Sequence, residues 1–309
     1  MMSLIKKFKE LIFKNYLEKK LFMLGTSHFI KSRAYYKNIK SLSDAEFKIY
    51  SQNGEDGILD YLIFSLGIKR PKFIEIGIGD YSESNSRFIF ERTSPKGMVV
   101  DSIPDLENKI KKRIKIWKGD LKIVNKEINS NNVLDTLKKD KMMVDLDLFS
   151  IDIDGIDYWV LDKLPKFFSK IVVLEYNPTF GFELEVSVPN ISNFNRTLYH
   201  YSNLCFGMSF KAALNLMDKK GFYFVGSNFL KNNAFFISKK YKKEKYFKNL
   251  RIDKSKSNVD ANFRESRDLN NKLNYFSGNK KIKEILNCKV VNLGNKKKKI
   301  VKIKDLLSN

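Results

Sequence analysis

The sequence predicts a doubly wound α/β protein, in which a mostly parallel sheet of seven strands carries helices on both faces. Short apolar runs alternate with longer amphipathic segments through the middle of the chain. One of these runs, FIEIGIGD, ends in a carboxylate and two glycines and leads into a helical segment. With 309 residues and 43% hydrophobic content, the chain can bury one or two sizeable cores.

Five buried parallel strands are predicted where apolar runs are bounded by polar residues. They are 72–79, 97–101, 113–117, 147–154 and 170–178. Helices are expected between them, at 84–92, 103–113, 127–140 and 158–168. A helix and a closing pair of strands follow, within 206–226 and 232–238. This pair brings the number of strands to seven and ends the sheet in a hairpin.

The net charge of +23 is concentrated in two flanks. Residues 1–40 hold ten Lys or Arg against two Glu, and residues 239–309 hold 22 against seven acidic residues. Between them, residues 41–238 are neutral. We therefore expect a basic helical extension at 1–40, an α/β domain at 41–240 and a basic appendage at 241–309. A basic patch is necessary for nucleic-acid binding but far from sufficient, so nucleic acid is not an expected partner.

The first flank has the pattern of an amphipathic helix. Its apolar residues, from Leu4 to Leu24, lie near helical spacing, and its lysines fall largely off that stripe. Two interpretations remain open. The stripe docks on the globular body, which is the commoner arrangement, or residues 1–24 lie on an anionic membrane surface.

Neither a signal peptide nor a transmembrane segment is expected. The first residues contain no uninterrupted apolar run before a small-residue cleavage site, and no window approaches the roughly 18 apolar residues that span a bilayer. The two cysteines, Cys205 and Cys288, form no disulfide or zinc pattern. We expect a cytoplasmic protein, peripheral to the inner face of the membrane if the second interpretation of the first flank holds.

The strongest chemical signal is the glycine turn after the first strand. Gly77 and Gly79 let the backbone approach a ligand closely, and Asp101 follows at the end of the second strand, where a carboxylate suits two ribose hydroxyls. The alternative is that both glycines only permit a tight turn. Ser82 replaces the third glycine of the dinucleotide pattern, and no P-loop motif is present.

Taken together, these segments resemble the FkbM-type S-adenosylmethionine-dependent methyltransferases, in particular a subgroup with a YSQxGED segment. The matching segments include YSQNGEDGIL, FIEIGIGDYSESNSRF, SIDIDGIDYWVL and VVLEYNP, and they fall within residues 45–290. The resemblance implies a Rossmann-like class I methyltransferase fold, which seven strands ending in a hairpin also suit. It further implies methyl transfer to a hydroxyl of a small, glycan or nucleotide-sugar-related substrate. The alternative is a non-catalytic binding scaffold of the same fold, at the membrane surface or elsewhere.

The resemblance also implies S-adenosyl-L-methionine as the cofactor and a set of residues that bind it. These are Glu75, Gly77, Gly79, Asp80, Asp101, Asp120 and Asp152. Asp120 would accept a hydrogen bond from the adenine amino group. In the family's acidic element after the fourth strand, Asp154 stands where Glu is more usual.

Methyl transfer to a hydroxyl requires in-line positioning and a group that takes the proton. The candidate bases are Asp154, Glu175 and His200. Asp152 and Asp154 share one face if the strand continues through them, and with Glu175 they would form a cluster able to hold Mg²⁺. The alternatives are that Asp152 caps the next helix and that His200 is a packing residue.

The expected substrate contacts come from four parts of the chain. They are Ser51, Gln52, Glu55, Asp56, Asn177, Tyr201, Arg264 and Arg267. For the first four the alternative is a helix start, with Asn53 as the N-cap and Asp56 three residues on. The two arginines suit a phosphate or carboxylate, or else an internal salt-bridge network. The oligomeric state stays open.

Overall fold

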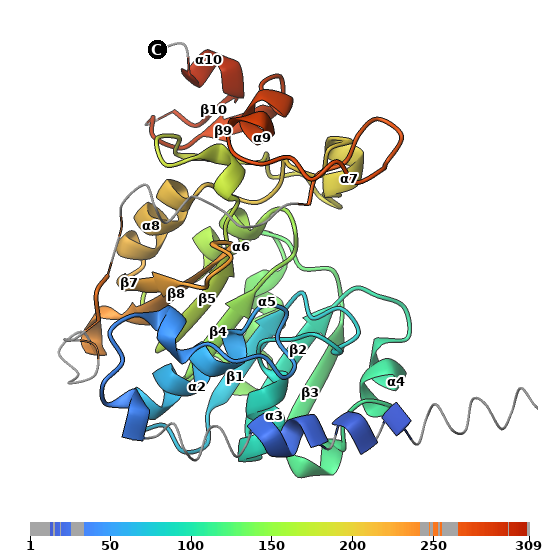
Figure 1. Ribbon diagram of the computed structural model, residues 1–309, viewed down its shortest axis with the longest axis vertical. Coiled ribbons are helices and arrows are strands. Elements are labelled where there is room, and N and C mark those ends of the chain that lie inside the picture. The colour runs from blue at the N-terminus through green and yellow to red at the C-terminus, as the bar shows by residue number, and fades with distance from the viewer. Residues whose placement is uncertain are drawn as a thin grey trace, which may run out of the picture.

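The computed structural model describes residues 13–307, except 15, 19, 26–33, 242–246, 248–249, 253, 255–264 and 296. Its main feature is a central sheet with helices on both faces and a smaller module at one end (Figure 1). The sheet has seven strands in the order β3-β2-β1-β4-β5-β8-β7. The predicted sheet of seven mostly parallel strands is therefore confirmed.

Five strands of this sheet are parallel. They are β1 (Lys72–Ile76), β2 (Lys96–Asp101), β3 (Asp120–Asn125), β4 (Leu148–Ile151) and β5 (Ile171–Glu175). Strand β8 (Asn233–Ser238) lies antiparallel between β5 and β7 (Phe222–Ser227), as the predicted hairpin requires. The strand order reverses between β1 and β4, and ligands of open α/β sheets bind outside the carboxyl ends at such a point.

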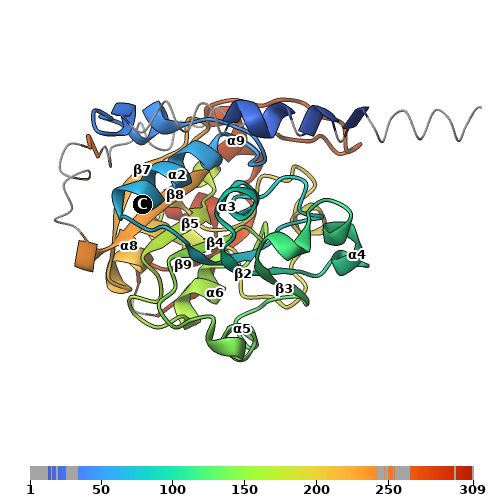
Figure 2. The same ribbon diagram turned by 90° about the horizontal axis from the view of Figure 1, so that it is seen from below.

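Helices cover both faces of the sheet (Figure 2). One face carries α2 (Glu55–Ser65), α3 (Arg87–Thr93) and α4 (Leu106–Lys111), and the other carries α5 (Val133–Leu137), α6 (Asp157–Lys163) and α8 (Phe210–Lys219). Successive strand residues point to opposite faces, so Phe73 belongs to the first core and Ile74 to the second. Short 3₁₀ helices lie at Leu42–Ala45 (η1), Ile116–Lys118 (η2), Lys139–Lys141 (η3), Pro178–Phe180 (η4) and Lys239–Tyr241 (η5).

The predicted third strand, at 113–117, is wrong. The chain leaves α4 there and forms η2, and β3 begins three residues later with Asp120 paired to Lys96. Ile114 is buried against the α2–α4 face of the sheet, and Ile116 packs beside it. Two apolar residues at a spacing of two therefore pack into the core from a turn. A short sequence with this spacing has the same pattern as a strand, so the pattern alone cannot tell the two apart.

A small module stands over the carboxyl ends of the strands (Figure 1). Its sheet joins β6 (Val186–Ser187), β9 (Lys289–Asn292) and β10 (Lys299–Lys302), accompanied by α7 (Arg196–Tyr199), α9 (Asn279–Glu284) and α10 (Ile303–Leu307). Its separate core includes Val186, Cys205 and Val290. We call it the cap module. It combines 178–208 with 265–307, so part of the expected α/β domain packs with the appendage.

The described residues between 13 and 25 are helical, at the opposite end of the domain from the cap module (Figure 1). In the part of the chain that the structure describes, no helix combines the length and apolar character needed to cross a membrane.

Candidate active site

The glycine turn after β1 is shaped by close backbone approach. Gly77 has φ of +83°, and a Cβ at this position would lie 1.6 Å from the carbonyl oxygen of Asp152. Only glycine lets β1 and β4 come this near at their carboxyl ends. Gly79 has φ of +54° with open space around it, so conformation alone favours glycine there.

Asp101 is anchored beside this turn. Its Oδ2 accepts a hydrogen bond from the Gly79 amide at 2.8 Å, and its Oδ1 accepts one from the Ile103 amide at 3.1 Å. These bonds fix the carboxylate at the end of β2, half-buried at the edge of a cavity. Each carboxylate oxygen keeps a further lone pair for a ligand hydroxyl.

A cavity of about 510 Å³ opens at the carboxyl ends of β1, β2 and β4. Its apolar walls are Ile76, Val100, Ile128, Ile156 and Phe194, and its polar walls include Asp101, Glu127, Asp152 and Asp154. We call it the main cavity. Lys126, Glu127 and the 193–195 segment of the cap module are lining residues that the sequence did not indicate.

A second cavity of about 260 Å³ adjoins the main cavity, because both are lined by Gly77, Gly79 and Asp152. We call it the side cavity. Its walls are mainly polar and come from Gln52, Glu75, Asp80 and 82–85. The two cavities together place Glu75, Gly77, Gly79, Asp80, Asp101 and Asp152, all predicted to bind the cofactor, around one continuous wall.

Glu75, at this wall, is held by hydrogen bonds from other residues of the chain. The buried carboxylate accepts hydrogen bonds from the Ser84 hydroxyl at 2.6 Å and from the amides of Asn85 and Ser86 at 2.8 Å each. Burial raises the pKa of Glu75, and these donors act in the opposite direction. The carboxylate therefore holds the start of α3 against β1. Asp80 forms an ion pair with Arg113 beside it.

Three carboxylates meet where β4 and β5 end. Oxygens of Asp152, Asp154 and Glu175 all lie within 4.8 Å of one another. Asp152 and Glu175 share a hydrogen bond, and burial raises the pKa of both, with the negative charge of the neighbouring acids adding to the effect. Two carboxyls this close are therefore harder to ionise together than either would be alone.

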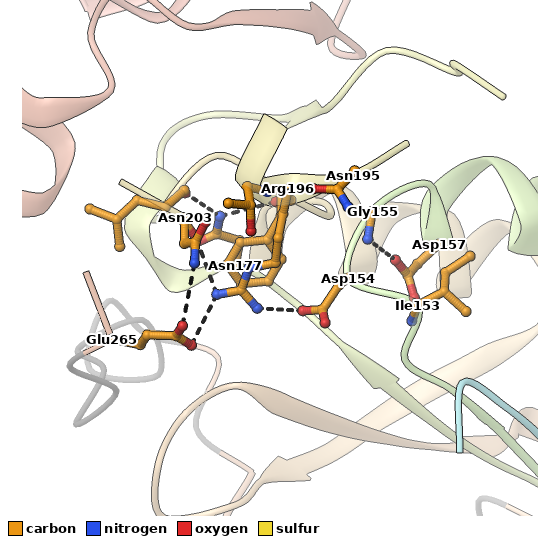
Figure 3. Close-up of polar contacts among 12 residues, drawn as sticks. Ile153, Asp154, Gly155, Asp157, Asn177, Asn195, Arg196, Asn203 and Glu265 are labelled. Carbon is orange, nitrogen blue, oxygen red and sulfur yellow. Dashed lines mark hydrogen bonds and ion pairs between the residues drawn. The ribbon is translucent and has the colours of Figure 1, made fainter. Parts of the chain in front are cut away.

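Asp154 reaches this cluster from a turn. Strand β4 ends at Ile151 and Asp154 has φ of +53°, so the strand does not continue through Asp152 and Asp154, which was the condition for their sharing one face. The turn brings both carboxylates into the cluster instead. The turn is held by Asp157, whose carboxylate accepts the amides of Ile153 at 3.0 Å and Gly155 at 3.1 Å (Figure 3). Asp157 therefore fixes the turn before α6, whose N-cap is Ile156 and not Asp152.

Arg196 is the residue of this site that the sequence did not indicate. Its Nη1 donates to Asp154 Oδ1 at 2.5 Å, and its Nη2 donates to Glu265 Oε2 and to the Asn203 carbonyl at 3.2 Å each (Figure 3). The guanidinium also stacks on the Phe206 ring at 4.2 Å. Arg196 thus joins the turn after β4 to the cap module. Its neighbour Asn195, which caps α7, was the one local signal.

This arginine also bears on the possible Mg²⁺ site at Asp152, Asp154 and Glu175. Asp154 already has a cation at hydrogen-bond distance, and the same positive charge acts on Asp152 and Glu175. A divalent ion would have to compete with a fixed guanidinium for the Asp154 carboxylate. As they stand, the three residues therefore do not fit a magnesium site.

The YSQNGED segment is mostly structural. Asp56 accepts the amides of 49–51 at 2.6 to 3.0 Å, and the Ser51 hydroxyl accepts the Asp56 amide at 3.0 Å. Glu55 Oε1 accepts the side-chain amides of Asn228 and Asn233 at 2.8 Å each. Because all three side chains are fully buried with these partners, the prediction of substrate contacts at Ser51, Glu55 and Asp56 is wrong.

Gln52 differs from these neighbours. It is exposed and lines the side cavity, so it keeps its place as a candidate ligand contact. The N-cap of α2 is Gly54 in a left-handed conformation, in place of the expected Asn53.

Two further predictions are contradicted by position. Asp120 begins β3 at the amino edge of the sheet, where it is exposed and lies 3.4 Å from Lys96, so it cannot reach an adenine at the carboxyl edge. Asn177 is fully buried, and its amide bonds the Leu204 and Phe206 carbonyls and the Thr179 amide. It fastens the cap module and leaves no group for a substrate.

The remaining candidates that the structure describes, His200, Tyr201 and Arg267, lie in the cap module and line neither cavity. The His200 ring contacts the Ser202 hydroxyl at 2.7 Å and stacks on Tyr201, which in turn bonds Glu284. Arg267 donates to the Asn271 carbonyl at 3.0 Å and lies 3.7 Å from Glu265. These contacts correspond to the internal salt-bridge network that was the alternative to substrate binding. Arg264 lies outside the described residues.

The strand order β3-β2-β1-β4-β5-β8-β7 is that of a Rossmann-like class I methyltransferase fold, as predicted. No family model and no curated protein matches the chain. Among solved structures it is similar to the pyocyanin biosynthetic protein PhzM, with 12% identity over 57% of this chain and 52% of that chain and a TM-score of 0.33. It is also similar to the small RNA methyltransferase HEN1, with 14% identity over 57% of this chain and 24% of that one and a TM-score of 0.34. The chain thus spans about half of the first protein and about a quarter of the second.

Proposed function

We propose that the protein is an S-adenosylmethionine-dependent O-methyltransferase. The observation that supports this most is the pair of cavities around the Gly77 and Gly79 turn, with Asp101 anchored at the end of β2. A volume of about 510 Å³ lies in the usual range for cofactor sites, and the turn admits no larger residue at Gly77. These features fit an adenosine with its ribose hydroxyls on Asp101 and its base among Ile128, Ile156 and Phe194.

The side cavity would take the methionine end of the cofactor. Its polar walls, including Gln52 and Asp80, suit an ammonium and a carboxylate. Bound S-adenosylmethionine supplies an electrophilic methyl group. The chain's own contribution is to hold the acceptor hydroxyl in line and to take its proton.

Asp152 and Glu175 are suited to that proton transfer. Burial and the neighbouring negative charges raise the pKa of both carboxyls, so an ionised member of the pair is a stronger base than an exposed carboxylate. Arg196 forms an ion pair with Asp154 beside these two carboxyls and offsets part of the negative charge there. The proposal requires no metal ion.

The acceptor we propose is a small polyhydroxylated molecule, related to a glycan or a nucleotide sugar. The support for it is the polar wall formed by Asp154, Asn193 and Asn195, which offers hydrogen-bonding groups to hydroxyls. Basic residues of the flanks would favour an anionic group on such a substrate.

Titration calorimetry with S-adenosylmethionine tests the cofactor. We expect binding by the wild-type protein, a loss of about tenfold or more for Asp101→Ala, and no change for Asp120→Ala, which removes the same group at the opposite edge. Absence of binding, or equal losses for both variants, would overturn the proposal. Binding without a methylated product from hydroxylated acceptors would instead favour the non-catalytic scaffold.

A further inference from the structure

The helix of residues 13–25 uses one face to hold the α/β domain. Glu18 lies 3.8 Å from Arg87, the Phe22 ring packs 6.3 Å from the Phe88 ring, and Gly25 packs directly on Ile49. Residues 18, 22 and 25 are spaced by four and three, so they form one side of the helix. This side is oriented toward α3.

The opposite side of the helix is apolar and exposed. Phe13, Tyr16, Leu17, Leu21 and Leu24 lie at spacings of three, one, four and three residues, and are exposed by 66, 56, 47, 47 and 67%. We call these five residues the outer stripe. An amphipathic helix normally turns such a stripe toward a core. Here the helix docks by its narrower face, and the outer stripe points into solvent.

Basic residues accompany the outer stripe. Residues 1–40 carry a net charge of +8 in a chain whose middle part is neutral. Lys20 lies within the stripe itself, with its ammonium 5.1 Å from the centre of the Tyr16 ring. A lysine stem that runs along an aromatic ring keeps its charge at the edge of the apolar surface.

A further exposed aromatic residue, from outside the helix, lies close to it. The Lys118 ammonium lies 5.8 Å from the centre of the Phe22 ring, and its neighbour Trp117 is 80% exposed. Lys115 is also exposed in the same turn. Tryptophan next to lysine is typical of side chains that lie at a membrane–water interface.

We infer that the outer stripe, together with Trp117, docks the protein on an anionic lipid bilayer. Packing against a second copy of the chain would take the Lys20 ammonium out of water, which costs free energy. On a bilayer the same ammonium reaches the lipid phosphates while the stripe enters the acyl boundary. The cap module and the carboxyl ends of the strands lie at the other end of the molecule and stay open (Figure 1).

Vesicle flotation with the full chain tests this inference. We expect binding to vesicles that contain about 30% phosphatidylglycerol, little binding to pure phosphatidylcholine, and release at high salt. Leu17→Glu combined with Leu21→Glu should lower the partition coefficient about tenfold or more. The matched control is Leu269→Glu with Ile300→Glu, which adds the same two negative charges at side chains exposed by 78 and 61%. Its binding should fall only by the electrostatic effect of these two charges.

Tryptophan fluorescence gives a second readout. The emission of the wild-type protein should shift to shorter wavelength on the anionic vesicles, and Trp117→Phe should lose that shift although Trp159 remains. Equal binding by the stripe variant and the control, or no binding to anionic vesicles, would overturn the inference. So would a dimer in sedimentation velocity that the stripe variant abolishes, because the stripe would then belong to a second copy.

Discussion

Arg196 Nη1 lies 2.5 Å from Asp154 Oδ1, and this ion pair joins the turn after β4 to the cap module. Asp154 lines the main cavity, and Arg196 is held from its other side by Glu265 and Asn203. The pair therefore couples the position of the cap module to the electrostatics of the acidic cluster.

Replacing Arg196 should impair catalysis more than folding. We expect Arg196→Ala to lower kcat by about 10²-fold, because the cluster loses its fixed positive charge. The kcat of Arg196→Lys should lie between those of wild type and Arg196→Ala, since a single ammonium cannot bond Asp154 and Glu265 at the same time. The matched control is Arg267→Ala, which removes an arginine bonded within its own loop. Similar losses for Arg196→Ala and Arg267→Ala in a methyl-transfer assay would contradict this role.

Glu175→Gln tests the proposed role of the Asp152–Glu175 carboxyl pair as the proton acceptor. The variant keeps the size of the side chain but removes one titrating group of the pair, so the dependence of kcat on pH should lose its acid limb and kcat should fall by about 10²-fold. A variant whose pH profile matches wild type would show that the proton goes elsewhere. Thermal unfolding measured alongside separates this from loss of structure.

The two glycines of the turn should differ in their tolerance of alanine. At Gly79 only the positive φ is unfavourable, so Gly79→Ala should cost about 1 to 2 kcal/mol of unfolding free energy. Gly77→Ala adds a clash with the Asp152 carbonyl and should cost more than about 3 kcal/mol. Urea unfolding of both variants measures the difference, and equal values would contradict the close approach of β1 and β4.

Gln52 and Glu55 should separate function from stability within one short segment. Gln52→Ala should weaken S-adenosylmethionine binding by about tenfold with an unchanged melting temperature, because the side chain is exposed in the side cavity. Glu55→Ala leaves the buried amides of Asn228 and Asn233 without their acceptor and should cost about 2 to 4 kcal/mol of stability. Calorimetry and urea unfolding on the same two proteins provide the comparison, and a stability loss at Gln52 would argue against its role.

Asp56 makes stability depend on pH. Burial raises its pKa from 3.8 in the unfolded chain to about 6 in the folded one, so the folded state binds the proton more tightly. The resulting stabilisation is full below pH 3.8 and is lost as pH rises through 6, a difference of roughly 3 kcal/mol. Asp56→Asn should flatten this part of the unfolding free energy between pH 4 and 7. An unchanged slope would contradict the assignment.

Much of the fold followed from local pattern. Short apolar runs at β1, β2, β4 and β5 were found to within a few residues, because a strand buried on both faces leaves a continuous apolar signal. The third strand was predicted too early in the chain, because Ile114 and Ile116 have the spacing of strand residues although they lie in a turn. The glycine turn was recognised because its geometry admits few other residues.

The functional site was predicted less completely, because its members are joined only by folding. Glu55 and Asp56 are acidic residues of the kind that often bind ligands, but their partners lie within the protein. Asp56 accepts nearby backbone amides, and Glu55 accepts the side-chain amides of Asn228 and Asn233, which lie far along the chain. Conversely, Arg196 sits in an unremarkable polar stretch, 42 residues from Asp154 and 69 from Glu265.

By itself, the sequence determined the order of strands and helices, the turn at Gly77 and Gly79, and the separation of basic flanks from a neutral middle. These depend on side-chain periodicity, backbone conformation and charge, which are local properties. The tertiary structure alone decided which acids meet at the ends of β4 and β5. It also decided that Asp120 lies at the amino edge of the sheet, away from the cavities, and that the outer stripe faces solvent. Contacts between distant segments depend on how the chain packs, and packing energies are shared among many residues that no short segment contains.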